Sequence, residues 1–206
     1  MQRRRFIVLL ASFPGVVRAQ AAVAARLAVL TELLEAVKAA GEAIGSLTDG
    51  FRTLVVAGAD SYDYVSAARE RSWLVELGRH TAQLLGNQNY MVVESISSYL
   101  SDPDKTEAKW RPIVANFEKT LVSVNTLLAD VKQEKGDFVL EPAYVKLQEM
   151  LNGRVTLLTR LQAMDAPTTA EEIALLKEIN GRYMTLVAST RKALAELNAY
   201  LKDQKK

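Results

Sequence analysis

The chain has 206 residues, of which 49% are hydrophobic and 24% are charged. This length and composition suit one globular domain with a sizeable core and exclude a disordered chain. The absence of cysteine excludes disulfides, thiolate metal sites, cysteine nucleophiles and a lipoprotein anchor. A carboxylate-bridged di-iron site is also disfavoured, because it normally takes a histidine from each of two helices and His80 is the only histidine.

The net charge of +2 does not indicate a nucleic-acid-binding protein. Four arginines lie in the first 21 residues, which contain no acidic residue. Removing these four charges changes the net charge of the remainder from +2 to −2. We therefore expect no nucleic-acid partner.

Residues 1–21 have the layout of a cleavable signal peptide. A basic start at Arg3–Arg5 precedes an apolar run over 6–17 and a small-residue end. Cleavage is expected after Ala19 or Ala21. A membrane anchor is the alternative, but this short run, interrupted by a proline and a glycine, cannot span roughly 30 Å of hydrocarbon. The start partly resembles a twin-arginine signal, although general secretion is favoured.

The mature chain, residues 22–206, is predicted to form a single domain of five long helices. Hydrophobic residues recur every three or four positions in five stretches. The expected helices cover about 22–57, 61–100, 103–134, 142–164 and 169–201.

The strongest pattern lies in the third predicted helix. Its hydrophobic residues alternate at spacings of four and three: Trp110, Val114, Phe117, Leu121, Val124, Leu128 and Val131. Such a seam needs partner helices around it. Short connections imply antiparallel neighbours, so the predicted fold class is all-α: an elongated antiparallel, up-and-down bundle of about five long helices with coiled-coil-like seams.

Several local signals bear on the helix boundaries. Pro103 is expected at the first position of the third helix, after a cap at Asp102. The Gly86–Asn89 segment has poor helix propensity, so either the second helix breaks there or packing holds it together. Thr169 and Glu172 form a predicted capping box that begins the fifth helix.

Counting residues from the turns near Asp102 and Ala166 predicts a polar level inside the bundle. Gln88, Asn152 and Asn180 each lie 14 residues from one of these turns, about 21 Å along a helix. The neighbouring helices would contribute residues near Thr31 and Asn116, and glycines adjoin the three amides at positions 86, 153 and 181. These amides either face water or form a buried polar layer or ligand pocket.

Catalytic and metal-binding arrangements are not evident in the sequence. His80 follows Glu76 by one helical turn, but two side chains supply too few ligands for a metal. A half-buried histidine bonded to Glu76 is the expected arrangement. We expect no enzymatic activity, no metal and no cofactor, because no catalytic carboxylate pair, phosphate-binding loop or nucleophile motif is present.

The preferred functional interpretation is an exported, periplasmic or secreted, non-enzymatic helical bundle. It would act through protein–protein interaction as an accessory or structural component of a bacterial envelope or secretion assembly. Its expected partners are other envelope or secreted proteins, including its own copies. The alternative is a small-ligand-binding bundle of the sensor type, with a site at Gln88, Asn152 and Asn180. A membrane-inserting toxin is disfavoured, since no mature segment is apolar for long enough to span a membrane.

Overall fold

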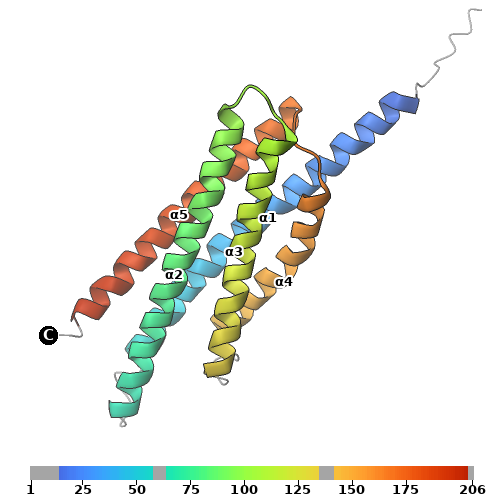
Figure 1. Ribbon diagram of the computed structural model, residues 1–206. Helices are drawn as coiled ribbons and strands as arrows, with labels where there is room; N and C mark the ends of the chain where they lie inside the picture. Colours follow the sequence, from blue (N-terminus) through green and yellow to red (C-terminus); the bar gives the residue numbers. More distant parts are fainter. Residues whose placement is uncertain (1–13, 58–63, 135–141, 204–206) are drawn as a thin grey trace, which may run out of the picture.

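The computed structural model describes residues 14–57, 64–134 and 142–203, and side-chain surroundings for part of these ranges. Every regular element in them is a helix: α1 (Pro14–Ala57), α2 (Tyr64–Ser101), α3 (Glu107–Glu134), α4 (Pro142–Ala163) and α5 (Ala170–Asp203). The five helices lie alongside one another (Figure 1). The all-helical class expected from the sequence is therefore confirmed over the described residues.

Contacts between helices fix their relative directions. Glu32 of α1 pairs with Arg160 of α4, and one turn later on α1 the Ala36 carbonyl accepts a hydrogen bond from Arg154. These two helices therefore run in opposite directions. By contrast, Arg26 and Gly41 of α1 lie near Glu172 and Leu186 of α5, respectively, so α1 and α5 run in the same direction (Figure 1).

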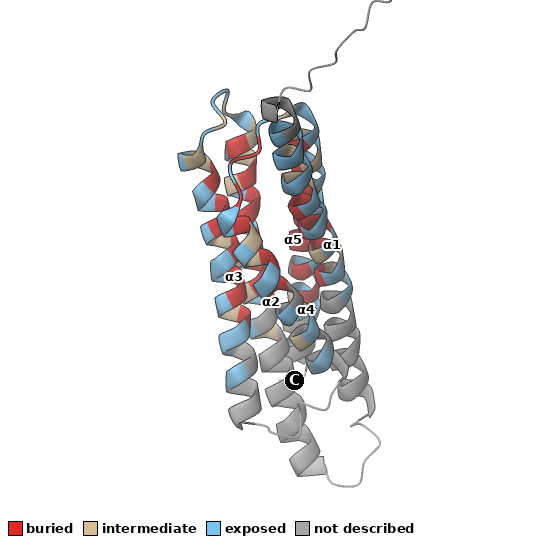
Figure 2. Cartoon of the chain, turned by 90° about the vertical axis from the view of Figure 1, so that its right-hand side faces the viewer, coloured by how far each residue is buried: buried red, intermediate tan, exposed pale blue. Residues whose placement is uncertain are grey.

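The core follows the strongest seam of the sequence. Five of its seven predicted residues, Trp110, Val114, Phe117, Leu121 and Val124, are buried. The other two lie outside the side chains that the structure describes. Buried residues occupy the inner sides of the helices (Figure 2). Near one end of the core, the rings of Tyr99 and Trp110 meet edge to face, with centroids 5.9 Å apart.

Helix α1 begins before the predicted mature chain. It starts at Pro14 rather than Ala22, and proline is well tolerated at a first helical position because its missing N–H has no helical partner there. Residues 18–22 are exposed, and from residue 18 onward the first buried residue of the helix is Val29. The packed part of the bundle thus begins after both predicted cleavage points.

The expected start of the third helix is wrong. Helix α3 begins at Glu107, and Pro103 lies in the preceding turn. The Asp102 carboxylate accepts a hydrogen bond from the Asp104 N–H at 2.8 Å, which holds the turn. The Thr106 carbonyl then accepts the first helical bond, from the Trp110 N–H. The Asp102 side chain therefore holds the turn and pairs with Lys109 in the first turn of α3, but it does not cap a helix beginning at Pro103.

Packing keeps α2 continuous through its least helical segment. Gly86 is buried, and a Cβ atom added to it would lie 3.6 Å from Thr190 Cγ2 of α5. Asn89 is buried as well. Of the two outcomes expected for this segment, the continuous helix is the one observed, because tertiary contacts override poor local helix propensity.

The sequence pattern of the fourth helix predicts a hydrophobic stripe of Tyr144, Leu147, Leu151, Val155, Leu158 and Leu161, but Val155 is 59% exposed. Among the described side chains, α4 buries Arg154, Leu157 and Leu161, and Met164 is buried just after the helix ends. These residues keep a spacing of three and four, displaced by one position at the N-terminal side. The predicted stripe does not include Arg154, whose long aliphatic stem can pack in a core.

No helix among the described residues combines the length and hydropathy needed to cross a membrane.

Candidate functional site

The middle of α4 places a charged side chain in the core. Arg154 is only 2% exposed. One of its terminal nitrogens, Nη2, donates a hydrogen bond to the Ala36 carbonyl of α1 at 2.9 Å. Its guanidinium carbon lies 5.9 Å from the centre of the Phe117 ring of α3. The side chain thus reaches from α4 to two other helices and makes one cation–π contact.

No described carboxylate neutralises this cation. Arg154 Nε is buried and has no hydrogen-bond partner, and none of the ion pairs between described side chains includes Arg154. Burial lowers the pKa of the guanidinium, but arginine remains charged at physiological pH. A buried cation without a counter-ion is penalised by several kcal/mol of desolvation.

Tyr183 of α5 is the ionisable group that interacts with Arg154 electrostatically. Its side chain is fully buried. Burial raises the pKa of the Tyr183 hydroxyl to about 12, against the opposing effect of the Arg154 charge. The hydroxyl is therefore protonated near neutral pH. It can donate or accept a hydrogen bond but cannot serve as the counter-ion.

The one buried carboxylate among the described residues has a different partner. Glu172 accepts a hydrogen bond from Arg26 Nε at 2.6 Å. It precedes Tyr183 by eleven residues on α5, which corresponds to about 16 Å along the helix. Glu172 and Arg154 are therefore separate charged sites.

The structure does not bring the three predicted ligand-binding amides together. Asn180 is half-buried and donates to Ser97 Oγ of α2 at 3.0 Å. Ser97 is nine residues, or about 13 Å, from Gln88 on the same helix. Asn152 is exposed, and its described side-chain partner is Gln148 on its own helix. The count of 14 residues from the turn assumed a continuous helix, but residues 164–169 are not helical. Asn180 therefore lies closer to the turn than the count predicted.

Polar contacts do join α2 to its two neighbours, at a different level from the expected one. Asn116 of α3 donates to Ser95 Oγ at 2.6 Å, close to the Asn180–Ser97 contact in the sequence of α2. The Oδ1 atom of Asn180 is buried and unpaired. Of the glycines expected to thin the bundle, Gly181 is exposed with open space around it.

Arg154 could have been found in the sequence. It completes a spacing of three and four with Leu157, Leu161 and Met164. This pattern is as typical of a buried helix face as the predicted stripe through Val155 and Leu158. An arginine that continues a hydrophobic stripe indicates a buried charge. Neither Ala36 nor Tyr183 carries a comparable local signal, because their proximity depends on how the helices pack.

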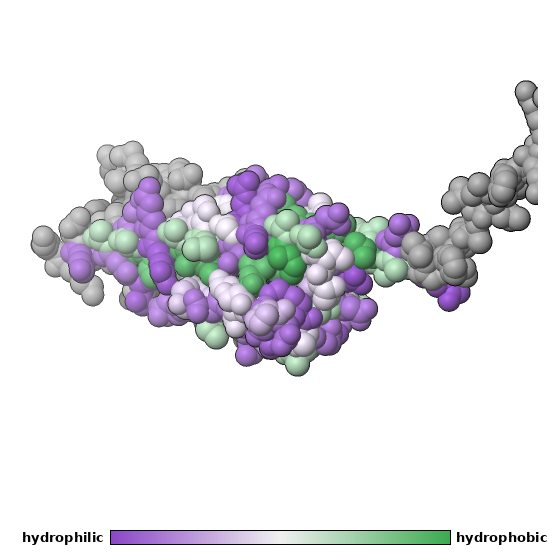
Figure 3. Space-filling model, turned by 90° about the horizontal axis from the view of Figure 1, so that it is seen from above, coloured by the Kyte–Doolittle hydropathy of each residue, from purple (hydrophilic) through white to green (hydrophobic). Residues whose placement is uncertain are grey.

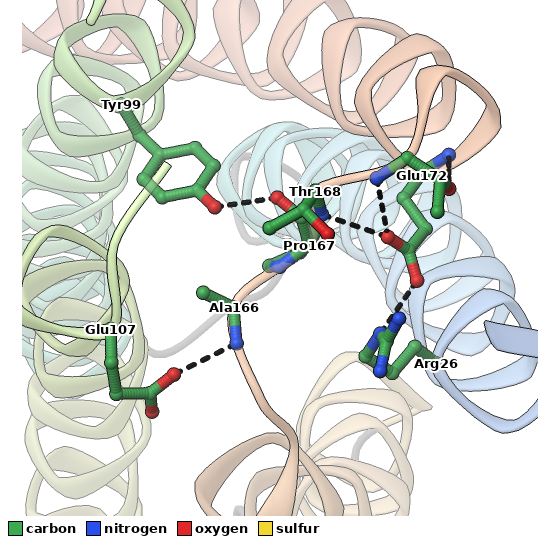
Figure 4. Close-up of polar contacts among 8 residues, drawn as sticks. Arg26, Tyr99, Glu107, Ala166, Pro167, Thr168 and Glu172 are labelled. Carbon is green, nitrogen blue, oxygen red and sulfur yellow. Dashed lines mark hydrogen bonds and ion pairs between the residues drawn. The ribbon is translucent and has the colours of Figure 1, made fainter. Parts of the chain in front are cut away.

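A second polar cluster fixes the turn between α4 and α5 (Figure 4). The Ala166 N–H donates to the Glu107 carboxylate of α3 at 2.8 Å, and the Tyr99 hydroxyl of α2 donates to the Pro167 carbonyl at 2.6 Å. These bonds tie the turn to the end of the α2–α3 pair. The turns near Asp102 and Ala166 therefore lie at the same end of the described bundle.

The predicted capping box is present in this cluster. Glu172 accepts hydrogen bonds from the N–H groups of Thr168 and Thr169 at 2.8 and 2.9 Å, and the Thr169 hydroxyl accepts from the Glu172 N–H at 3.3 Å. Burial alone would raise the pKa of Glu172. The hydrogen bonds from Thr169, Arg26 and Thr168 outweigh burial and lower it. This cluster is complete in itself and has a structural role.

The expected half-burial of His80 is wrong, whereas its expected hydrogen bond to Glu76 falls outside the described residues. Its side chain is exposed, and that of Glu76 lies outside the described surroundings. The part of the chain that the structure describes contains no group of three histidine or acidic side chains able to hold a metal.

Comparison of the chain with known protein families, curated proteins and solved structures gives no significant match. Arg154, Ala36 and Phe117, which are joined by the contacts of the buried guanidinium, form the Arg154 layer.

Proposed function

We propose that this chain is an exported, non-enzymatic helical bundle that binds a small anionic ligand in its interior. The observation that carries the proposal is the buried guanidinium of Arg154, which has no carboxylate partner among the described side chains and an unpaired Nε. Buried charges in proteins are normally paired or bound to a ligand. An anion bound to Arg154 would supply the missing charge and the missing acceptor.

The geometry favours a ligand-binding role over a purely structural one. A structural arginine would gain from a carboxylate, and the chain provides such a partner for Arg160 one and a half turns further along α4. Arg154 has a single carbonyl instead. A carbonyl satisfies one N–H group but carries no full charge. Leaving a cation in this state is consistent with a binding site, at the expense of stability.

Export and the arrangement of the helices are part of the same proposal. We place the mature protein, residues 22–206, in the periplasm or outside the cell. The exposed residues 18–22 support this, because their removal leaves the contacts of Arg26 and the core from Val29 onward intact. The opposite directions of α1 and α4 support an up-and-down bundle. The buried spacing of α3 supports a coiled-coil-like seam.

Native mass spectrometry of the protein purified from its exported fraction tests the binding role. A small co-purifying mass is expected with the wild type and with Arg160→Met, which alters an exposed arginine on the same helix. It should be absent from Arg154→Met. Bare protein in all three samples, under conditions that preserve non-covalent complexes, contradicts interior binding.

A protein–protein role, preferred from the sequence, remains the second candidate. Large hydrophobic side chains are exposed on four helices: Tyr90, Met91, Val122, Val145, Val155 and Met184. Seen from above, hydrophobic residues lie between hydrophilic ones across the molecule (Figure 3). Sedimentation of wild type and a Val122→Glu, Val155→Glu double variant tests this role. Self-association reduced in the variant supports it, and a concentration-independent monomer counts against assembly with its own copies.

A further inference from the structure

We infer that the interior ligand is a small monocarboxylate with an apolar body, held by the Arg154 guanidinium. This inference rests on the proposed interior-binding function and names the chemical class of its ligand. Three properties of the Arg154 layer define that class: its charge, its hydrogen-bonding groups and its apolar surroundings.

The charge of the layer matches one negative charge. Arg154 is the only basic side chain buried among the described residues. The Tyr183 hydroxyl is neutral, because burial raises its pKa to about 12. A phosphate or sulfate dianion would therefore leave one charge uncompensated in the core, which is strongly unfavourable. A monoanion would neutralise the layer.

The donors suit a carboxylate. The guanidinium is planar and presents its N–H groups as a fork that matches two carboxylate oxygens. One Arg154 nitrogen is bonded to the Ala36 carbonyl, while Nε remains available. The side of the fork that carries Nε therefore has no described acceptor and suits a carboxylate oxygen.

Buried apolar residues lie close in the sequence to each member of the Arg154 layer. Phe117 contacts the guanidinium directly. Val37 follows Ala36 on α1, Leu157 lies one turn after Arg154 on α4, and Leu121 lies one turn after Phe117 on α3. All three are buried in the hydrophobic core. Such surroundings favour a ligand whose body is apolar, since burying it removes hydrocarbon surface from water.

Thermal unfolding with defined probes tests this class. Dialysed mature protein would be unfolded in sodium benzoate, sodium butyrate, neutral benzamide, sodium sulfate or sodium phosphate, at equal ionic strength. Benzoate or butyrate should raise the midpoint by several degrees, increasingly with concentration, because ligand binding to the folded state stabilises it. Benzamide and the inorganic anions should not.

Variants locate the effect. Arg154→Met should abolish the carboxylate-dependent shift, whereas Arg160→Met should retain it. Arg154→Lys keeps the charge without the fork and should bind more weakly than the wild type. It replaces Arg154→Met if that variant does not fold.

The outcomes separate this inference from the function on which it rests. Equal stabilisation by sulfate or benzamide, or a carboxylate effect that persists in Arg154→Met, overturns the assigned class or site. Absence of any shift, combined with a co-purified mass in native spectra, overturns the monocarboxylate class and leaves interior binding standing. Absence of both overturns the two together.

Discussion

At the scale of single residues, two buried charges show opposite solutions to the same physical problem. Glu172 accepts three hydrogen bonds from Arg26, Thr168 and Thr169, and its charge is compensated. Within the part of the chain that the structure describes, Arg154 has one carbonyl acceptor and no counter-ion. The sequence identified Glu172 because a capping box has a local spacing. It did not identify Arg154, whose burial depends on the rotation of α4 about its axis.

Replacing Arg154 should stabilise the ligand-free protein. Arg154→Met keeps most of the volume of the side chain and removes a buried, uncompensated charge, so the free energy of unfolding should increase by on the order of 1–4 kcal/mol. Urea denaturation of dialysed protein measures it. Leu157→Ala, a cavity variant of the same helix, should instead lose about 2–5 kcal/mol. A destabilised Arg154→Met variant would show that the arginine is a structural component of the core.

Two glycines provide a matched pair for the packing between α2 and α5. Alanine at Gly181 meets open space, and alanine at Gly86 meets Thr190 Cγ2 at an ordinary contact distance of 3.6 Å. Each substitution should therefore raise the free energy of unfolding by up to about 1 kcal/mol through helix propensity. Denaturant titration of both variants measures this. A loss at Gly86 alone would mean that α2 and α5 pack too closely there for a methyl group.

At the scale of elements, the ends of the helices were predictable where a side chain bonds to nearby backbone. Helix α5 begins at Ala170, directly after its capping residue Thr169, and α4 begins at Pro142, as expected. Helix α3 begins later than expected because Asp102 holds a turn instead of capping a helix. An aspartate before a proline can cap a helix or hold a turn, and the local sequence is the same in both cases. The surrounding packing decides between the two.

The capping cluster predicts a specific acid sensitivity. The pKa of Glu172 is lower in the folded state than its ordinary value of 4.5, so its ionised form stabilises the fold above that pH. This contribution is lost as the pH falls below about 4.5 and through the folded-state pKa. Glu172→Gln should lower stability by about 1–3 kcal/mol at pH 7, through weaker hydrogen bonds, and less at pH 3.

Urea midpoints of wild type and Glu172→Gln at both pH values measure this difference. Glu171→Gln is the matched control, since Glu171 is the exposed neighbour in the same helical turn. Its effect should stay within about 0.5 kcal/mol. An equal deficit at pH 7 and pH 3 for Glu172→Gln would show that the charge of Glu172 is not the source of its contribution.

At the scale of the whole molecule, the number of helices and the all-α class followed from the periodicity of the sequence. The lengthwise position of each helix relative to its neighbours did not. Trp110 and Phe117 belong to a spacing that only a helix buries on one side. The level shared by Gln88, Asn152 and Asn180 required knowing where each helix starts relative to its neighbours. The non-helical turn before Ala170 shifted that relation, and no residue pattern records such a shift.

Removal of residues 1–21 should leave the bundle unchanged. The described contacts of α1 begin at Arg26, so the thermal midpoint of residues 22–206 should equal that of the full chain. Scanning calorimetry of both proteins tests this. N-terminal sequencing of the exported protein should begin at Gln20 or Ala22. A lower midpoint for the shortened chain would indicate that the first turns of α1 contribute to the fold.

The parallel course of α1 and α5 has a mechanical consequence. Because the two helices lie side by side and point the same way, the described chain starts at one end of the bundle and finishes at the other (Figure 1). Tension applied between Pro14 and Asp203 would slide one helix lengthwise along the other. The Arg26–Glu172 pair and the contact near Gly41 would then be loaded together, in shear, instead of opening one after another.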